Sequence, residues 1–131
     1  MFLHILTLDQ QTAFLALAKQ FIAADEVLSG EEHNQLELAM AEVGWDFDEE
    51  VPEISKEDIV KAFDTPSAQR VALLELIGIG LADQEFHPNE NAFVCDMAGR
   101  WGIAEGTVPK LLSWVERQIA LAREGEDLLA G

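Results

Sequence analysis

The sequence predicts an all-α fold, a compact bundle of six to seven helices that contains two related helix–turn–helix units. First, apolar residues recur at three- and four-residue spacing along most of the chain, which is the period of an amphipathic helix. Second, residues that commonly begin and end helices separate these stretches. Third, the pattern around Asp25 recurs 58 residues later, around Asp83. No stretch predicts a strand convincingly, so we expect helices joined by short connections.

The composition fits a single acidic helical domain over residues 1–131. Hydrophobic residues make up 49% of the chain, which is enough to bury a sizeable core. The 25 acidic and 8 basic residues give a net charge of −17, which argues against nucleic-acid binding and permits cations or basic protein partners. The chain has one cysteine, Cys95, and no apolar run long enough to span a bilayer. We therefore expect a cytoplasmic protein without integral membrane association. The composition leaves the oligomeric state open.

Two helices are predicted in the first third of the chain. The segment before them, over residues 1–8, is either a separate helical turn or a packed arm. Residues 9–24 form a helix with one apolar face. That face consists of Phe14, Leu17, Phe21 and Ala24. In the next helix, over residues 29–43, Ser29 and Glu32 have the spacing of a capping box. Its buried face is predicted to contain Leu36, Ala39, Met40 and Val43.

The middle of the chain is predicted to hold a loop, a short helix and a central helix. Residues 45–54 are expected to form the loop, because clustered carboxylates and a proline oppose regular structure. A short helix follows, with Ser55 as its N-cap. Thr65 is the expected N-cap of the next helix, which runs to about residue 81. Its second half is apolar on nearly all sides, with Glu75 as the only charge, so this helix should lie at the centre of the core.

Two more helices are predicted in the last third of the chain. His87 is the expected N-cap of the first, with Pro88 in the first helical position and Glu90 in the third. Thr107 is the expected N-cap of the last, long helix, and residues 126–131 are expected to fray at its end. The inward face of this last helix is predicted to contain Leu111, Leu112, Val115, Ile119 and either Leu121 or Ala122.

An internal repeat relates the two halves of the chain. A shift of 58 residues aligns two segments without a gap, at about residues 11–44 and about residues 66–102. The aligned pairs include Asp25 with Asp83, Glu32 with Glu90, and Gly44 with Gly102. Each copy consists of a helix, an acidic turn, a second helix and a terminating glycine. We therefore expect two helical hairpins packed about a pseudo-two-fold axis.

The two acidic turns, ADEVLSGEE and ADQEFHPNE, resemble the signature turns of the TerB-like tellurite-resistance family. The resemblance covers about residues 11–121. The family usually has glycine directly after the motif Asp, where this chain has Glu26 and Gln84. The resemblance implies a compact helical bundle, a link to tellurite and other chemical stress, and a divalent-cation site built from the motif acids.

The acidic turns are the predicted cation site. Carboxylate oxygens are the ligands that Ca²⁺, Mg²⁺ and Mn²⁺ prefer, and each turn could aim an Asp and a Glu at one weakly bound ion. The predicted ligands are Asp25, Glu32, Asp83, Glu90 and Glu85. An EF-hand is excluded, because Leu36 and Val94 occupy the position where its bidentate Glu is required. In the alternative interpretation the same acids only cap two helices.

The segment WDFDEE is the predicted partner-binding patch. Its aromatic and acidic side chains could bind a basic protein partner; they are Trp45, Asp46, Phe47 and Asp48. In the alternative interpretation, Trp45 and Phe47 fold back onto the core and the acids stay solvated.

The sequence predicts a protein without enzymatic activity. No nucleophile elbow, zinc-protease motif or phosphate-binding glycine motif is present in the chain. The first hypothesis is a TerB-like module of a tellurite or chemical-stress response that binds a divalent cation. The alternative is a metal-independent acidic adaptor or scaffold that binds a protein partner.

Overall fold

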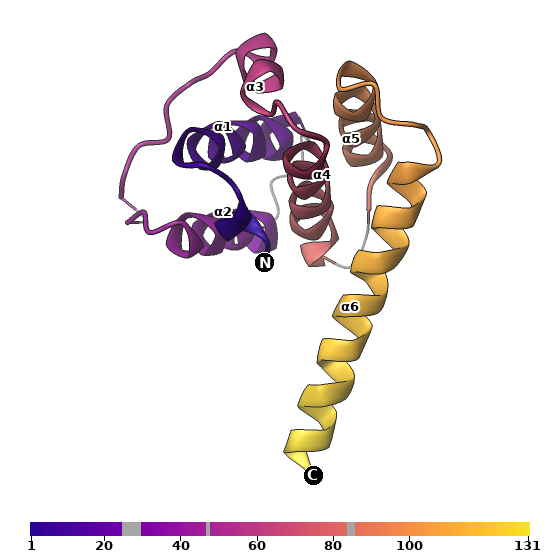
Figure 1. Cartoon of the computed structure of the whole chain (residues 1–131). Coiled ribbons are helices and arrows are strands. Elements are labelled where there is room, and N and C mark those ends of the chain that lie inside the picture. The colour runs from indigo at the N-terminus through magenta and orange to yellow at the C-terminus, as the bar shows by residue number, and fades with distance from the viewer. Residues whose placement is uncertain (25–29, 47, 84–85) are drawn as a thin grey trace.

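The computed structural model describes the chain except for residues 25–29, 47 and 84–85, and except for the side chains of residues 30–32 and 83. Helices are joined by short connections, and no strand occurs in the described part of the chain (Figure 1). The helices are η1 (Leu3–Ile5), α1 (Leu8–Ala24), α2 (Gly30–Glu42), α3 (Lys56–Ala62), α4 (Pro66–Gly80), η2 (Leu81–Asp83), α5 (Pro88–Arg100) and α6 (Thr107–Ala130). The predicted all-α bundle is therefore confirmed.

Two helices, α1 and α4, form the centre of the core. Helix α4 is buried on nearly all sides, as its sequence predicts. For α1 the prediction of one apolar face is wrong, because Leu15, Ala16 and Ala18 are buried as well, whereas Ala24 is exposed. The reason is that α1 contacts α2, α3, α4 and α5, so its small alanines face neighbouring helices on several sides.

The helix contacts follow the predicted pseudo-two-fold arrangement. Helices α1 and α4 contact each other, and each also contacts the second helix of the other hairpin, α5 or α2. Helix α3 packs on α1, and α6 packs on α4 in the corresponding way. Helices α2 and α5 are both 13 residues long and begin 58 residues apart, at Gly30 and Pro88. The repeat in the sequence is therefore a repeat in the fold.

Both hairpins end at the predicted glycines in the same way. Gly44 has a φ of 83° and Gly102 a φ of 67°, a left-handed conformation that residues with a Cβ avoid. The amide after each glycine bonds back to the last turn of the helix, which is the pattern of a Schellman motif. These bonds are Trp45 N to Met40 O at 2.8 Å and Ile103 N to Ala98 O at 2.9 Å.

Most predicted helix starts are confirmed. The Oγ of Ser55 accepts a hydrogen bond from the amide of Asp58 at 3.1 Å, and this starts α3. Helix α4 starts at Thr65, whose Oγ1 accepts from the amide of Ala68 at 3.2 Å. The capping box predicted for Ser29 and Glu32 lies outside the described residues and side chains.

Helix α6 differs from its prediction at both ends. Its N-cap is Gly106 rather than Thr107, and no side chain caps it. Residues 126–130, for which fraying is expected, are helical, because α6 continues to Ala130. Leu, Ala and Glu dominate its last turns, and these residues have high helix propensity without any packing. The second half of α6 projects away from the bundle (Figure 1).

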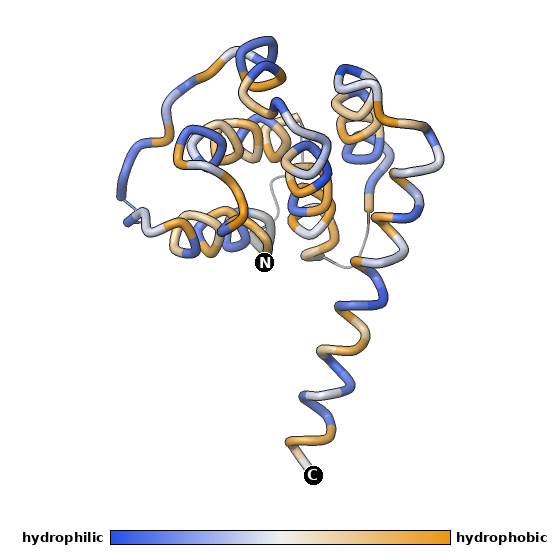
Figure 2. Tube along the Cα trace, viewed as in Figure 1, coloured by the Kyte–Doolittle hydropathy of each residue, from blue (hydrophilic) through white to orange (hydrophobic). Residues whose placement is uncertain are grey.

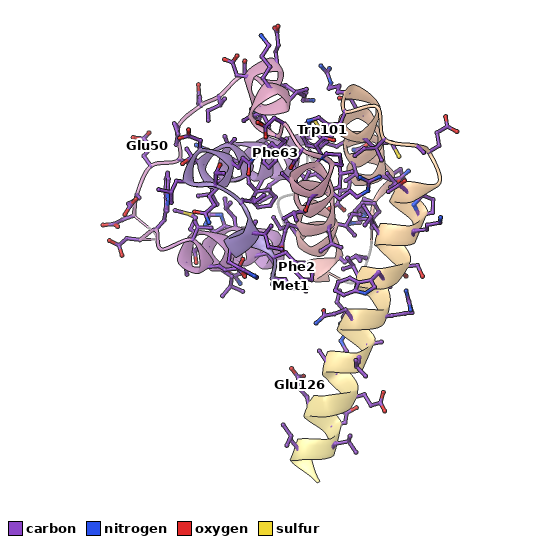
Figure 3. The ribbon with its side chains drawn as sticks, in the orientation of Figure 1. Met1, Phe2, Glu50, Phe63, Trp101 and Glu126 are labelled. Atoms are coloured by element: carbon purple, nitrogen blue, oxygen red, sulfur yellow. The ribbon has the colours of Figure 1, made fainter. Side chains whose placement is uncertain are left out.

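The segment before α1 is both a short helical turn and a packed arm. It contains η1, and Leu3 and Leu6 are buried in the core. The Met1 ammonium forms ion pairs with Glu42 and, at 3.1 Å, with Glu75. Burial lowers the pKa of this ammonium, but its contacts with the two carboxylates outweigh burial and raise the pKa above its ordinary value of 8.0. Figure 3 labels Met1 and Phe2 where the arm meets the bundle.

The second hairpin is tied to the α3 region by an aromatic contact. The rings of Phe63 and Trp101 meet edge to face, with centroids 5.5 Å apart (Figure 3). The indole N–H of Trp101 donates to the backbone O of Val60 at 3.1 Å. The half-buried Trp101 therefore satisfies its one polar atom while it fills space between the two halves.

Candidate functional site

The predicted cation ligands are only partly described by the structure. Asp25 and Glu85 lie outside the described residues, and so do the side chains of Glu32 and Asp83. Along the backbone, Glu32 is the third residue of α2, and Asp83 ends η2. Glu90 is the predicted ligand whose side chain is described. Within the described part of the chain, no group of three or more His, Cys, Asp and Glu side chains is placed to hold a metal ion.

Glu90 is buried at the start of α5, with 2% of its surface exposed. Its Oε1 accepts a hydrogen bond from the amide of His87 at 3.0 Å. The predicted start of α5 is thereby confirmed, with His87 as N-cap, Pro88 as first residue and Glu90 as third. The carboxylate also benefits from the positive end of the helix dipole.

Gly80 makes room for Glu90 and for the ring of Phe86. A Cβ at position 80 would lie 2.7 Å from Oε2 of Glu90 and 2.8 Å from the Phe86 ring. The end of α4 can therefore approach the start of α5 closely only without a side chain at this position. Carboxylate oxygen suits a hard cation chemically, but Glu90 is already placed to close this junction, which favours the capping interpretation for this residue.

The predicted partner patch at residues 45–50 lacks an exposed aromatic side chain among its described residues. Trp45 is half-buried and packs against the core, as the alternative interpretation expects. Asp46 and Asp48 are exposed, and Phe47 lies outside the described residues. The exposed carboxylates alone would give charge without an apolar anchor.

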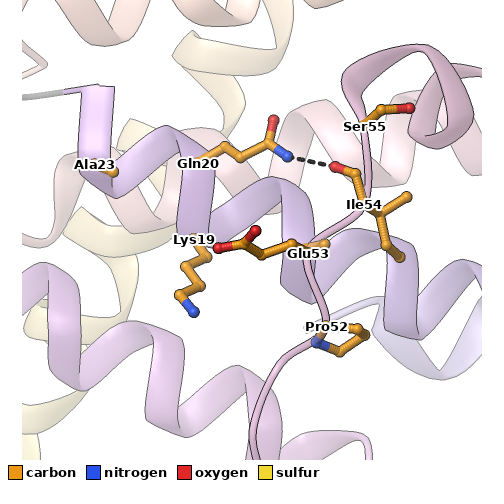
Figure 4. Close-up of a pocket in the computed structure, with 8 residues that line it drawn as sticks. Lys19, Gln20, Ala23, Pro52, Glu53, Ile54 and Ser55 are labelled. Carbon is orange, nitrogen blue, oxygen red and sulfur yellow. Dashed lines mark hydrogen bonds between the residues drawn. The ribbon is translucent and has the colours of Figure 1, made fainter.

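A shallow pocket lies between α1 and the extended segment before α3 (Figure 4). Its volume is about 510 Å³. The Nε2 of Gln20 donates to the backbone O of Ile54 at 2.7 Å, which holds this segment against α1. Lys19 and Glu53 contribute the charged groups of its lining. The described side chains suggest no specific ligand for this pocket.

A second hollow, called here the α6 groove, lies between α2, the end of α4, the N-terminal arm and α6. Its volume is about 360 Å³. Its apolar lining includes Leu38, which is 61% exposed, and Ile119 of α6. Its charged lining includes Glu42 and Glu75, which hold the Met1 ammonium, and Arg123 on α6.

The apolar stripe of α6 continues from the bundle into solvent. Residues seven apart lie on one face of an α-helix, because seven residues make almost two turns. Two such series run along α6: Val108, Val115, Ala122 and Leu129, and Trp114, Leu121 and Leu128. Their first members are covered by the bundle, with Val108 and Val115 buried and the Trp114 ring centroid 5.9 Å from that of Phe2. Their last members are exposed.

The exposed part of the stripe is the feature that sequence reasoning missed. Leu121 or Ala122 was expected to face inward, but both are exposed. Exposure reaches 67% for Leu121, 77% for Leu128 and 92% for Leu129. The physical reason is that α6 is longer than the helix it packs on: it has 24 residues, whereas α4 has 15 (Figures 1 and 2). This difference in predicted helix length is the signal that could have revealed it.

No described helix is both long and apolar enough to cross a membrane. Comparison of the chain with family models, with curated proteins and with solved structures finds no match. The function must therefore be inferred from the geometry of the chain itself.

Proposed function

We propose that this protein is a non-enzymatic acidic adaptor that binds a helical protein partner through the protruding part of α6 and the α6 groove. The observation that carries the proposal is the exposed apolar stripe, which includes Leu121 and Leu128. Water-soluble domains rarely leave aligned large apolar residues exposed, and such patches are typical of protein-binding surfaces.

The surface has the form that helical partners recognise. An amphipathic helix lays its apolar face into a hydrophobic groove through residues at three-, four- and seven-residue spacing. The stripe of α6 has this spacing, and one of its members, Val115, lines the α6 groove together with the exposed Leu38 of α2. A partner helix placed here would cover side chains that the bundle leaves in water.

The proposal can be tested by selecting helices from a displayed library. Wild-type protein is the target, and the variant Leu121→Gln/Leu128→Gln is used for counter-selection. This variant keeps the charge of the protein, and Gln keeps a high helix propensity. We expect the enriched helices to bind wild type and to share apolar residues at heptad spacing.

The matched control is Ser113→Gln/Ala120→Gln, which changes two exposed α6 residues away from the stripe. This control should bind the enriched helices as wild type does. If no helix is enriched, or if the enriched helices bind the counter-selection variant equally well, the adaptor proposal at this surface is wrong.

The second candidate function is the TerB-like one, a cation-responsive module of a tellurite or chemical-stress response. One observation favours it: Glu32 and Glu90 are the third residues of α2 and α5, so the motif acids occupy equivalent places in the two hairpins. Asp and Glu are suitable ligands for Ca²⁺, Mg²⁺ or Mn²⁺. Glu90 already caps the start of α5 through the amide of His87, so this candidate is weaker than the adaptor.

Thermal melts with each divalent ion, compared with NaCl at matched ionic strength, test the cation site. Matching is needed because any salt relieves repulsion in a chain with a net charge of −17. A specific ion at a hundredfold excess over its Kd should add about 2.7 kcal/mol to the free energy of unfolding. A response that Asp83→Asn/Glu90→Gln leaves intact would contradict a site at the second turn.

A further inference from the structure

The exposed stripe of α6 has a carboxylate on each side, with Arg117 one heptad before the first of them. At about 100° per residue, Glu124 lies about 60° to one side of Leu121, and Glu126 lies about 60° beyond Leu129 on the other side. Both glutamates are exposed, and Figure 3 labels Glu126 on the projecting part of α6. Charges that border an apolar seam determine which helix can pair with it.

The charged groups of the α6 groove include two carboxylates that already bind a positive group. Glu42 and Glu75 together bind the ammonium of Met1, so this pair of carboxylates accommodates an amine beside apolar side chains. Arg123 is the basic side chain among the described groove residues.

We infer that the occupant of this surface is a basic amphipathic helix, with Leu-like residues on one face and Lys or Arg beside them. This inference rests on the proposed adaptor function and specifies the partner. The apolar face of the helix would pack on Leu121 and Leu128. Its basic residues would lie close to Glu124 and Glu126, where paired charges set the partner and its orientation.

A second copy of this chain is a poorer occupant. It would bring the same acidic borders, Glu124 and Glu126, against themselves. It would also bring another net charge of −17, and like charges across an interface oppose association.

Four synthetic helices of about three heptads test the inference. Three share the same Leu heptads and differ only in the flanking residues, which are Lys, Gln or Glu. The fourth has the Lys composition in a scrambled order that removes the apolar face. Their Kd values are measured by titration calorimetry with wild type, with Leu121→Gln/Leu128→Gln and with Glu124→Gln/Glu126→Gln. Circular dichroism verifies that each variant is folded.

We expect wild type to bind the Lys helix at least about tenfold more tightly than the Gln helix, and the Glu helix most weakly, because several exposed ion pairs contribute together. The Leu variant should bind the Lys helix at least about tenfold more weakly than wild type. The Glu variant should lose most of the preference for Lys over Gln but still bind the Gln helix as wild type does. Added salt should reduce the difference in affinity between the Lys helix and the Gln helix.

Three results would overturn the inference, and they separate it from the adaptor proposal. If the Gln helix binds wild type as tightly as the Lys helix does, the partner is not basic, while the adaptor function stands. Wild type could bind the scrambled Lys peptide as tightly as the Lys helix, or the Leu variant could bind the Lys helix as tightly as wild type does. In either case only bulk charge attraction operates, and both proposals fail. If sedimentation shows a dimer that the Leu variant abolishes, a second copy is the occupant.

Discussion

The two halves of the molecule use the same hairpin but end in different third helices. Helix α3 follows the first hairpin and has 7 residues, whereas α6 follows the second and has 24. Both pack on the central helix of their own half. The large apolar side chains in the extension of α6 remain exposed, so they bury little surface against the bundle. The comparison teaches that two similar hairpins can carry third helices of very different length, and the proposed binding surface lies where the halves differ most.

A second departure concerns equivalent positions on α2 and α5. Leu38 and Asp96 correspond under the 58-residue shift. Asp96 interacts with Arg100 at 3.0 Å and with Lys56 of α3 at 3.5 Å, which ties the two halves together. Leu38 instead remains 61% exposed beside the α6 groove. One half uses this position for a structural contact, and the other leaves it apolar and accessible.

The largest expected effect tests the symmetry of the core. Leu15 of α1 and Leu73 of α4 occupy corresponding positions, and both are fully buried. Leu15→Ala and Leu73→Ala should each lower the free energy of unfolding by about 2–5 kcal/mol, measured by urea denaturation. If one substitution costs less than half of the other, the two central helices are not equivalently packed, and the comparison of the halves must be revised.

A smaller effect on the free energy of unfolding is expected at a position where the two halves carry side chains of different size. Gly80 at the end of α4 corresponds to the buried Ile22 of α1. Gly80→Ala should destabilise the fold by about 1–3 kcal/mol, because its Cβ would overlap with Glu90 and Phe86. Gly78→Ala is the matched control, since a Cβ there meets nothing within 4 Å. Equal stability of the two variants would show that the α4–α5 junction has room to adjust.

The glycines that end the hairpins should respond alike. Gly44→Ala and Gly102→Ala should each cost about 1–2 kcal/mol in thermal or urea unfolding, because both residues have positive φ and a Cβ would strain the backbone. Gly99→Ala, inside α5 with open space around it, should instead be neutral or stabilising. A neutral result at either terminating glycine would contradict the equivalence of the two helix ends.

A weaker, pH-dependent effect is expected at Asp96. The hydrogen bond from Arg100 lowers the pKa of this carboxyl below 3.8, partial burial opposes the shift, and Lys56 adds to it. A folded-state pKa below the unfolded value means that the stabilisation is present above about pH 4 and is lost as the pH falls through the folded value. Asp96→Asn should therefore reduce the difference in stability between pH 6 and pH 3.

The charge-matched control for this prediction is the exposed Asp48→Asn. Urea midpoints at both pH values give the comparison. If Asp96→Asn follows the same pH profile as the control, the contacts of Asp96 with Arg100 and Lys56 contribute nothing to acid sensitivity.

The smallest effect is expected at the projecting part of α6. Leu121→Gln/Leu128→Gln should change the free energy of unfolding by no more than about 0.5 kcal/mol, because both side chains are already exposed. Val115→Ala, in the packed half of the same helix, should lower it by about 1–3 kcal/mol. A large loss in the Leu variant would mean that the stripe stabilises the fold rather than a complex.

Local sequence signals predicted most of the fold. Thr65 and Pro66 start α4, and Gly44 ends the first hairpin, because capping and positive φ depend on a few adjacent residues. The periodicity also predicted which α6 residues share a face. It could not predict that Leu121 is exposed, because periodicity defines a face without stating what covers it.

The candidate site was less predictable than the fold. For Glu90, a ligand and a helix cap have the same sequence pattern, and the tertiary contact with Gly80 was needed to favour the cap. For Trp45, burial depends on the neighbouring helices rather than on the acidic residues beside it. The α6 groove depends on α2, α4 and the N-terminal arm together, and no local pattern contains that information.

The unequal packing along α6 has a consequence for local opening. Amide hydrogens near Val108 and Val115 can exchange with solvent only when the packed core around them opens. The projecting turns have no such support, and helices shorter than about 12–15 residues are marginally stable in water. Hydrogen exchange should therefore become faster along α6 towards Ala130. A bound helix would join these turns to the cooperative unit of the bundle, so slower exchange at the end of α6 would itself report occupancy.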